Sequence, residues 1–362
     1  MSSIFETDAA LDKLATISIA RTKELMAQSD KLRDRREKAN RKRVARLFKD
    51  PKAIEATITL TDEVMRISSV KSSSRIFRRA AKKASITGFG PLNGIGLHAI
   101  GVLSHALPSP VVAAVHQRVR ALSKDLILAS EAEKLSKHMA KRFDKGIALN
   151  INVLGEAVLG DHEAELRFQS ILEMMRRPEV NYISVKLSSI VAQLIIIDID
   201  GSIDRVSEKM RILYREAQQH GVFVNLDMEE YRDLPMTVAA FKRVLDEEEF
   251  SSLTAGIVLQ AYLPEAHHFF GELVEWSKKR YQRSGGTIKV RLVKGANLAM
   301  ERAEAELHGW SPAPYRSKSD VDASYVRLID AALRPEHSKA VRIGIASHNL
   351  FHMTWALEVA KS

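Results

Sequence analysis

The chain has 362 residues, 45% of them hydrophobic, which is enough to bury one large core or two ordinary ones. It carries a formal net charge of +10 and contains no cysteine. The absence of cysteine excludes disulfides, thiolate nucleophiles and cysteine metal ligands, and it is typical of a protein of the reducing cytoplasm. No apolar run is long enough to span a bilayer, and residues 1–14 lack the apolar stretch of a secretory signal.

The positive charge is concentrated in the front part of the chain. Residues 1–150 hold 29 lysines and arginines against 15 aspartates and glutamates, whereas residues 151–362 hold 26 against 30. We therefore expect the two parts to face different partners or surroundings.

Helical patterns dominate this front part. Residues 7–48 are predicted to form one helix, because apolar residues recur at helical spacing and no Gly or Pro occurs before Pro51. Residues 61–85 and 110–143 are predicted to be helical as well. The basic run at 33–46 is interpreted as a solvated helical face, and contact with an acidic partner such as nucleic acid or anionic lipid is the alternative.

A turn-rich stretch, GFGPLNGIG at 88–96, interrupts the helices. It superficially resembles a phosphate-binding loop. No strand is predicted before it, however, and no Lys-Ser/Thr pair follows, so the stretch predicts a linker.

From residue 147 onward, short β-rich runs alternate with amphipathic helical segments such as 162–177 and 203–220. The predicted strands are 146–154, 182–188, 222–227, 255–262, 288–295 and 341–347. Strands separated by helices in this way indicate parallel pairing through right-handed crossovers.

Polar side chains stand at or just past the carboxyl ends of nearly all these strands. They are Lys186, Asp227, Gln260, Arg291 with Lys294, and His348 with Asn349. In a (β/α)8 barrel these ends converge on one mouth, whereas a doubly wound sheet would concentrate them at one switch point. The pattern favours the barrel, although six strands can be counted and a barrel needs eight.

Gathered at one mouth, these residues would bind an anionic cofactor and a small charged substrate. Asp227, with Glu229 and Glu230, supplies carboxylates, and Lys186 and Arg291 supply positive charge. Gln260 offers a neutral amide, and Lys294 precedes a glycine that lets the backbone approach a phosphate closely. His267 and His268 are adjacent, so they point apart on a helix and predict no zinc site.

Each residue also has a structural interpretation. Lys186 and Asp227 could form an ion pair at the strand ends, and Arg291 could be tied to a carboxylate such as Glu229. Gln260 could cap a strand end, and His348 could lie in a second layer. The joint placement of the set at successive strand ends favours the functional interpretation over these.

Several segments resemble the proline dehydrogenase family, and in particular the dehydrogenase part of the proline utilisation A proteins. They are ISVKLS (183–188), NLDMEEYRD (225–233), GIVLQAYLPEA (256–266), RLVKGAN (291–297) and ASHN (346–349), with 150–165 similar to the family's first strand and helix. The resemblance implies a distorted (β/α)8 barrel over 146–362, and residues 1–145 are loosely similar to the family's helical arm.

The resemblance also implies an FAD enzyme that oxidises L-proline to Δ1-pyrroline-5-carboxylate by hydride transfer to the flavin. It implies that Arg291 lies beside the reactive flavin nitrogen, that Lys186 meets the proline carboxylate, and that Asp227 shapes the substrate pocket. The cofactor contacts it implies are Met228 and Gln260 at the isoalloxazine, Lys294, Gly295 and Ala296 at the pyrophosphate, and Ser347 and His348 elsewhere. Asn297 departs from the family pattern, which often has Tyr after Lys-Gly-Ala, and this leaves the contact at that position open.

The sequence ends where the family's last two strands and a final helix with two arginines should follow. Because six open strands leave two unpaired edges, we expect the sequence to be part of a longer protein. The resemblance implies that an aldehyde dehydrogenase domain, which uses NAD, follows in that protein. We expect a cytoplasmic location. A quinone or other electron acceptor and peripheral contact of the basic front part with the inner face of the membrane stay open.

Two alternatives to an active flavoenzyme stay open at this point. One is a flavin-binding chain that lacks the complete substrate clamp. The other is a DNA-binding regulator of proline utilisation, but residues 1–12 show no alternating strand pattern of the kind such repressors carry at the front. Nucleic acid is therefore disfavoured as a partner, and a steep fall of duplex affinity with salt would revive it.

Overall fold

The computed structural model describes residues 8–64, 67, 69–83, 91–123, 132–153, 158, 160–192 and 194–362. Its contacts divide the chain into two units, one formed by Met1–Leu25 with Met139–Ser362 and the other by Met26–His138. The boundary between residues 145 and 146 that the sequence suggests stays a prediction.

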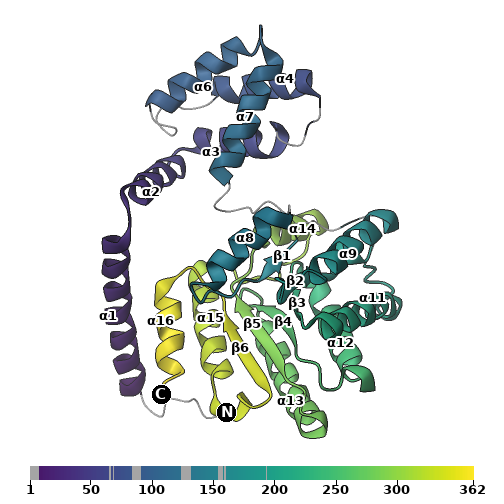
Figure 1. Ribbon diagram of the computed structural model, residues 1–362. Coiled ribbons are helices and arrows are strands. Elements are labelled where there is room, and N and C mark those ends of the chain that lie inside the picture. Colours follow the sequence, from purple (N-terminus) through teal and green to yellow (C-terminus); the bar gives the residue numbers. More distant parts are fainter. Residues whose placement is uncertain are drawn as a thin grey trace. The chain divides into compact units, whose positions relative to one another are not determined.

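A six-stranded parallel sheet forms the centre of the first unit (Figure 1). Its strands are β1 (Ile151–Asn152), β2 (Tyr182–Lys186), β3 (Phe223–Asp227), β4 (Ala255–Gln260), β5 (Ile288–Val293) and β6 (Val341–Ile345). They lie side by side in chain order, and every neighbouring pair is parallel. The six predicted strands are confirmed, although the first is much shorter than the predicted 146–154, of which residue 154 lies outside the described residues. An unbroken order from β1 to β6 has no switch point, so the doubly wound alternative is excluded.

Helices follow the strands and pack on the sheet. They are α9 (Asp161–Met175), α10 (Leu187–Ile190), α11 (Ile199–His220), α12 (Leu234–Leu245), α13 (Ala266–Ser284), α14 (Leu298–His308), α15 (Lys318–Ala332) and α16 (Leu350–Val359). Short 3-10 turns occur at Tyr231–Asp233, Glu248–Phe250 and Pro335–His337. Helix α13 contacts both β4 and β6, and α15 contacts β5. The predicted helices at 162–177 and 203–220 are confirmed as α9 and α11.

The strands alternate between a helix-facing side and an inner side. In β5, Ile288, Val290 and Leu292 are fully buried, whereas Lys289 and Arg291 between them are partly exposed. Because side chains alternate along a strand, Lys289 and Arg291 face the inner side of the sheet. This inner side carries the polar residues of the candidate site.

Helix α1 (Asp8–Leu32) lies alongside α16 in Figure 1. The hydroxyls of Thr22 and Thr354 are 2.7 Å apart, and Thr354 Oγ1 also donates to the carbonyl of Ser18. Ser18 and Thr22 are buried, so the middle of α1 covers part of α16.

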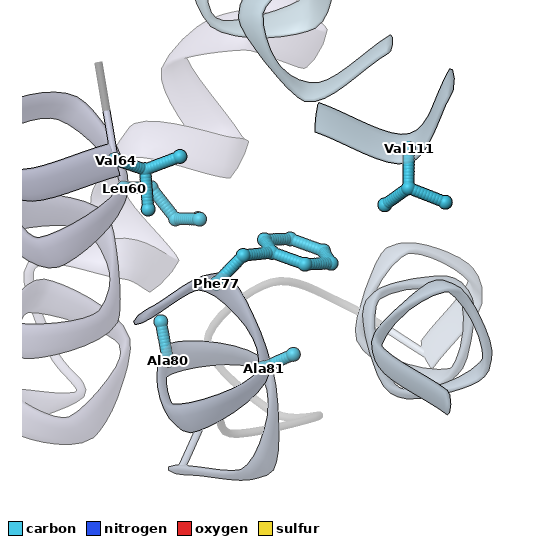
Figure 2. Packing of buried hydrophobic residues seen from close by; sticks show 6 residues of the cluster. All are labelled: Leu60, Val64, Phe77, Ala80, Ala81 and Val111. Atoms are coloured by element: carbon cyan, nitrogen blue, oxygen red, sulfur yellow. The ribbon is translucent and has the colours of Figure 1, made fainter. Parts of the chain in front are cut away.

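The second unit is built from helices. They are α2 (Arg35–Leu47), α3 (Pro51–Ile58), a π-helix (Thr59–Val64), α4 (Val70–Lys83), α6 (Pro91–Leu103) and α7 (Pro108–Ser123), and α8 (Ala132–Phe143) crosses into the first unit. Phe77 on α4 is fully buried among apolar side chains (Figure 2). The cluster in that view consists of Leu60, Val64, Phe77, Ala80, Ala81 and Val111.

Two predictions for the front part are wrong. The single helix predicted over 7–48 is interrupted at Arg33 and Asp34, because Asp34 caps α2 by accepting from the backbone N–H of Glu37 while Glu37 reaches back to the N–H of Asp34. The linker predicted over 88–96 is helical from Pro91 on, and proline is well tolerated at the first position of a helix. Residues 88–90 lie outside the described residues, as do 124–131 of the helix predicted over 110–143.

Among the described helices, none combines the length and the apolar character that a membrane crossing requires.

Candidate functional site at the carboxyl ends of the strands

Lys186 and Asp227 end β2 and β3 and are direct partners in the strand register. Arg291 on β5 is the register partner of Val258 on β4 and of Gly344 on β6. All three charged side chains therefore stand on the inner side of the sheet near the carboxyl ends of their strands.

Arg291 and Asp227 form an ion pair. Asp227 also accepts hydrogen bonds from Asn225 Nδ2, at 2.9 Å, and from Asn152 Nδ2, at 3.4 Å. A second nitrogen of Arg291 donates to Ser184 Oγ at 3.4 Å. Burial raises the pKa of Asp227, although the charge of Arg291 and the hydrogen bonds from Ser184 and Asn225 act against this rise.

Lys186 pairs with Glu229, which lies two residues beyond the end of β3. Ser188 Oγ donates to the other oxygen of the Glu229 carboxylate at 3.4 Å. The side chains of Lys186 and Glu229 are both 23% exposed, so this pair is reachable from solvent. An anionic ligand can therefore compete with Glu229 for Lys186.

The structural interpretation of these charges named the wrong pairs. It joined Lys186 to Asp227 and Arg291 to Glu229, whereas the structure joins Lys186 to Glu229 and Arg291 to Asp227. A guanidinium can donate to several acceptors at once, and Arg291 donates to both Asp227 and Ser184. The ammonium group of Lys186, at the end of β2, donates to Glu229 instead.

Gln260 ends β4 and is only 2% exposed. Its Nε2 lies 3.3 Å from the carbonyl oxygens of Met228 and Glu229. Gln260 therefore holds the segment that follows β3, and this segment carries the partner of Lys186. The expected contact of Met228 and Gln260 with the isoalloxazine stays a prediction.

The segment after β5 carries Lys294, Gly295 and Ala296. Lys294 forms an ion pair with Asp322 on α15, which also pairs with Lys318. These two lysines lower the pKa of Asp322 by charge and hydrogen bonding, although burial acts the other way. Gly295 has φ +123°, a backbone conformation that favours glycine, and Ala296 is exposed.

Ser347 and His348 follow β6. Ser347 Oγ accepts from the backbone N–H of Asn349 at 3.0 Å, and His348 is exposed. In the part of the chain that the structure describes, no hydrogen bond or ion pair links His348 to the other predicted site residues.

A group of carboxylates lies next to this mouth. Burial and the nearby Glu230, Glu229 and Glu301 raise the pKa of Asp233 to about 6, against the charge of Arg232. Glu301 on α14 accepts from the backbone N–H of Tyr231 at 2.7 Å. The segments after β3 and β5 are thus tied together by an acidic residue.

Sequence reasoning missed the inner polar residues that support the ion pairs, namely Asn152, Ser184 and Asn225. A signal for two of them was present, since Ser184 and Asn225 stand two positions before Lys186 and Asp227 and therefore face the same side of their strands. The described residues contain no group of three or more His, Asp or Glu side chains suited to holding a metal ion.

The parallel strands, the helices on the outer side and the charged groups at the carboxyl ends define the class. It is a (β/α)-barrel-type protein with a candidate ligand site at the mouth of the sheet. The predicted fold class is confirmed by solved structures of the same architecture. The structure of Proline Utilization A from Bdellovibrio bacteriovorus matches 96% of this chain and 36% of its own with a TM-score of 0.79 at 23% identity.

The comparisons with known proteins identify the family. The family model for proline dehydrogenase matches residues 135–362, well over half of the chain. The bifunctional protein PutA of Klebsiella aerogenes is 23% identical over 59% of this chain and 17% of its own length. The proline dehydrogenase of Deinococcus radiodurans is 27% identical over 51% of this chain and 52% of its own. The structure of PutA from Corynebacterium freiburgense is 50% identical over 67% of this chain and 26% of its own, with a TM-score of 0.65.

The chain therefore belongs to the proline dehydrogenase family. It spans about half or less of the length of the two curated relatives named above.

Proposed function

We propose that this chain binds FAD at the mouth of the barrel and oxidises L-proline to Δ1-pyrroline-5-carboxylate, a step in the catabolism of proline to glutamate. The observation that carries the proposal is that the charged side chains of Lys186, Asp227 and Arg291 lie together at the carboxyl ends of three strands. The family membership supplies the reaction class.

The residues at the mouth fit a flavin. Arg291 Nε and Asn225 Oδ1 are buried and have no hydrogen-bond partner among the described residues. Buried polar atoms without partners are rare in native structures and indicate a missing partner. A flavin ring has polar nitrogens and oxygens along one edge that could supply it. The loop of Lys294 and Gly295 offers a cation and a close backbone approach, which suit the two phosphates of FAD.

Bound FAD would supply the acceptor for the two electrons that proline loses when its C–N bond becomes a C=N bond. Arg291 would hold a positive charge beside the ring, and Asp227 would fix the direction of that guanidinium through the ion pair. Lys186 would bind the carboxylate of proline in exchange for Glu229. Met228 and Gln260 would line the ring, Lys294, Gly295 and Ala296 the pyrophosphate, and Ser347 and His348 other parts of the cofactor.

The electron acceptor that regenerates the flavin is proposed to be a quinone or another small acceptor, and the proposed location is the cytoplasm with peripheral contact to the membrane. The basic front part supports such contact, because α2 is rich in lysine and arginine and exposed. Co-sedimentation with anionic and with neutral vesicles tests it, and equal binding to both would contradict it.

The visible spectrum of the purified protein before and after anaerobic addition of L-proline tests the proposed reaction. Flavin bands that bleach with proline are the expected result. Flavin bands that persist unbleached would favour the alternative of a cofactor-binding chain with an incomplete substrate clamp. A protein that binds no flavin on reconstitution with FAD would contradict the proposal.

A further inference from the structure

Tyr262 joins three segments of the chain that are far apart in sequence. It lies two residues beyond the end of β4 and is 2% exposed. Its backbone N–H donates to the carbonyl of Lys294 at 2.8 Å, and its carbonyl accepts from the N–H of Tyr315 at 2.8 Å. The segments after β4, after β5 and before α15 therefore meet at this one residue.

The ring of Tyr262 lies directly over Gly295. A Cβ atom added at Gly295 would stand 2.5 Å from Cγ and Cδ1 of the ring and 2.7 Å from Cδ2. Carbon atoms that are not bonded prefer about 3.5–4.0 Å, so no side chain fits between the loop and the ring. Gly295 thus meets two separate requirements, its φ of +123° and the ring above it.

The backbone of Tyr262 also helps to place Asp322, the partner of Lys294 in its ion pair. Lys294 pairs with Asp322 on α15, and Tyr315 lies just before that helix. The carbonyl of Tyr262 therefore fixes the approach to α15, while its N–H and ring fix the loop that carries Lys294. Tyr262 therefore helps to place both members of the ion pair, Lys294 and Asp322.

We infer that Tyr262 is a positioning residue for cofactor binding, whose ring sets the course of the loop at 294–297. The inference rests on the proposed function for its ligand, FAD. The ring acts through Gly295, so its effect is a coupling between positions 262 and 295 and not a contribution of the phenol hydroxyl.

The experiment is a double-mutant cycle on the full chain, read by the Kd of FAD for the apoprotein. The variants are Tyr262→Ala, Gly295→Ala and the double variant, with Tyr262→Phe beside them. Tyr262→Phe keeps the ring and is expected to bind FAD within about twofold of wild type, whereas Tyr262→Ala weakens binding about tenfold, which corresponds to about 1.4 kcal/mol.

The decisive result is the cost of Gly295→Ala in the two backgrounds. The strain from φ is the same in both, so it cancels in the cycle, whereas the clash with the ring exists only where Tyr262 is present. We expect Gly295→Ala to weaken FAD binding at least several-fold less in the Tyr262→Ala background than in wild type. Equal costs in the two backgrounds would overturn the inference.

Amide hydrogen exchange of residues 294–297 gives a reading that does not depend on flavin. Tyr262→Ala is expected to speed exchange in this loop, and Tyr281→Ala, which removes an exposed tyrosine of α13, is the matched control. If wild type binds no FAD, the proposed function fails, while faster exchange on loss of the ring still supports the positioning role and unchanged exchange refutes it. A protein that binds FAD normally with Tyr262→Ala leaves the proposed function intact and refutes the positioning role alone.

Discussion

Arg291 on β5 pairs with Asp227 at the end of β3, and β4 lies between these two strands. Asp227 has its direct register partner, Lys186, on the neighbouring strand, yet the ion pair is made with the more distant residue. The guanidinium thereby becomes fixed on the inner side of the sheet, with its Nε buried and without a hydrogen-bond partner among the described residues.

This relationship predicts the effect of removing one charge. Arg291→Gln leaves the Asp227 carboxylate mostly buried without its cation, and we expect the free energy of unfolding to fall by about 2–4 kcal/mol. The double variant Arg291→Gln with Asp227→Asn should recover part of this loss, because no uncompensated charge stays behind. Urea unfolding followed by circular dichroism measures both changes.

Arg205→Gln is the matched control, because Arg205 pairs with Asp198 and both side chains are largely exposed. We expect it to cost less than about 1 kcal/mol. An Arg291→Gln variant as stable as this control would show that the Asp227 pair contributes nothing to folding.

Lys186 is expected to act on the substrate. Lys186→Met removes the cation proposed to meet the proline carboxylate, so kcat/KM for proline should fall on the order of 100-fold, which corresponds to about 3 kcal/mol of lost charged hydrogen bonding. Steady-state kinetics with a dye acceptor measures this, and the flavin content should stay at the wild-type level.

Lys209→Met is its control, since Lys209 pairs with Glu165 between two outer helices, α11 and α9. Glu229→Gln provides a second check, because it removes the group that competes for Lys186, and it should lower KM. A kcat/KM that is equal in Lys186→Met and Lys209→Met would exclude Lys186 from the substrate site.

The buried Asp233 predicts a pH dependence of stability. Its folded-state pKa is raised to about 6 from 3.8, so the folded protein binds its proton more tightly than the unfolded chain does. Stability from this group is present below about pH 4 and is lost as the pH rises through about 6. Asp233→Asn should therefore raise the free energy of unfolding, on the order of 2 kcal/mol above pH 6, and have little effect near pH 4.

Unfolding free energies at several pH values between 4 and 8 check this prediction. Asp144→Asn removes an exposed carboxylate after α8 and serves as the control. A difference between Asp233→Asn and wild type that does not change with pH would contradict the assignment of the effect to ionisation of Asp233.

Arg280 on α13 is predicted to be essential for the stability of the barrel. It is fully buried and donates to the carbonyls of Leu245, Phe250, Leu253 and Thr287, so one guanidinium reaches four backbone acceptors. Arg280→Met removes all of these donors from buried carbonyls, and we expect a loss of at least about 3 kcal/mol. Arg280→Lys should recover little, because an ammonium group lacks the fork of donors.

Thermal unfolding measures these variants, with the exposed neighbour Lys279→Met as control. If Arg280→Lys unfolds at the same temperature as wild type, the shape of the guanidinium is not what these carbonyls require.

The sequence by itself determined the order and type of the elements in the barrel unit. The alternation of short β-rich runs with amphipathic helical segments located the six strands, and the polar residues after them located the candidate site, because both signals are local along the chain. The break before α2 also has a local signal, because Asp34 followed three residues later by Glu37 is the pattern of a capping box.

Only the tertiary structure decided which charges pair and which residues hold the loops. Lys186, Asp227, Glu229 and Arg291 could pair in more than one way, and the choice depends on the stagger and curvature of the sheet. The ring of Tyr262 above Gly295 and the contacts of Arg280 with the carbonyls of Leu245, Phe250 and Leu253 join residues roughly 30 positions apart. Local propensity does not encode the distance between such segments. Crossover length and helix packing fix it once the whole sheet has formed.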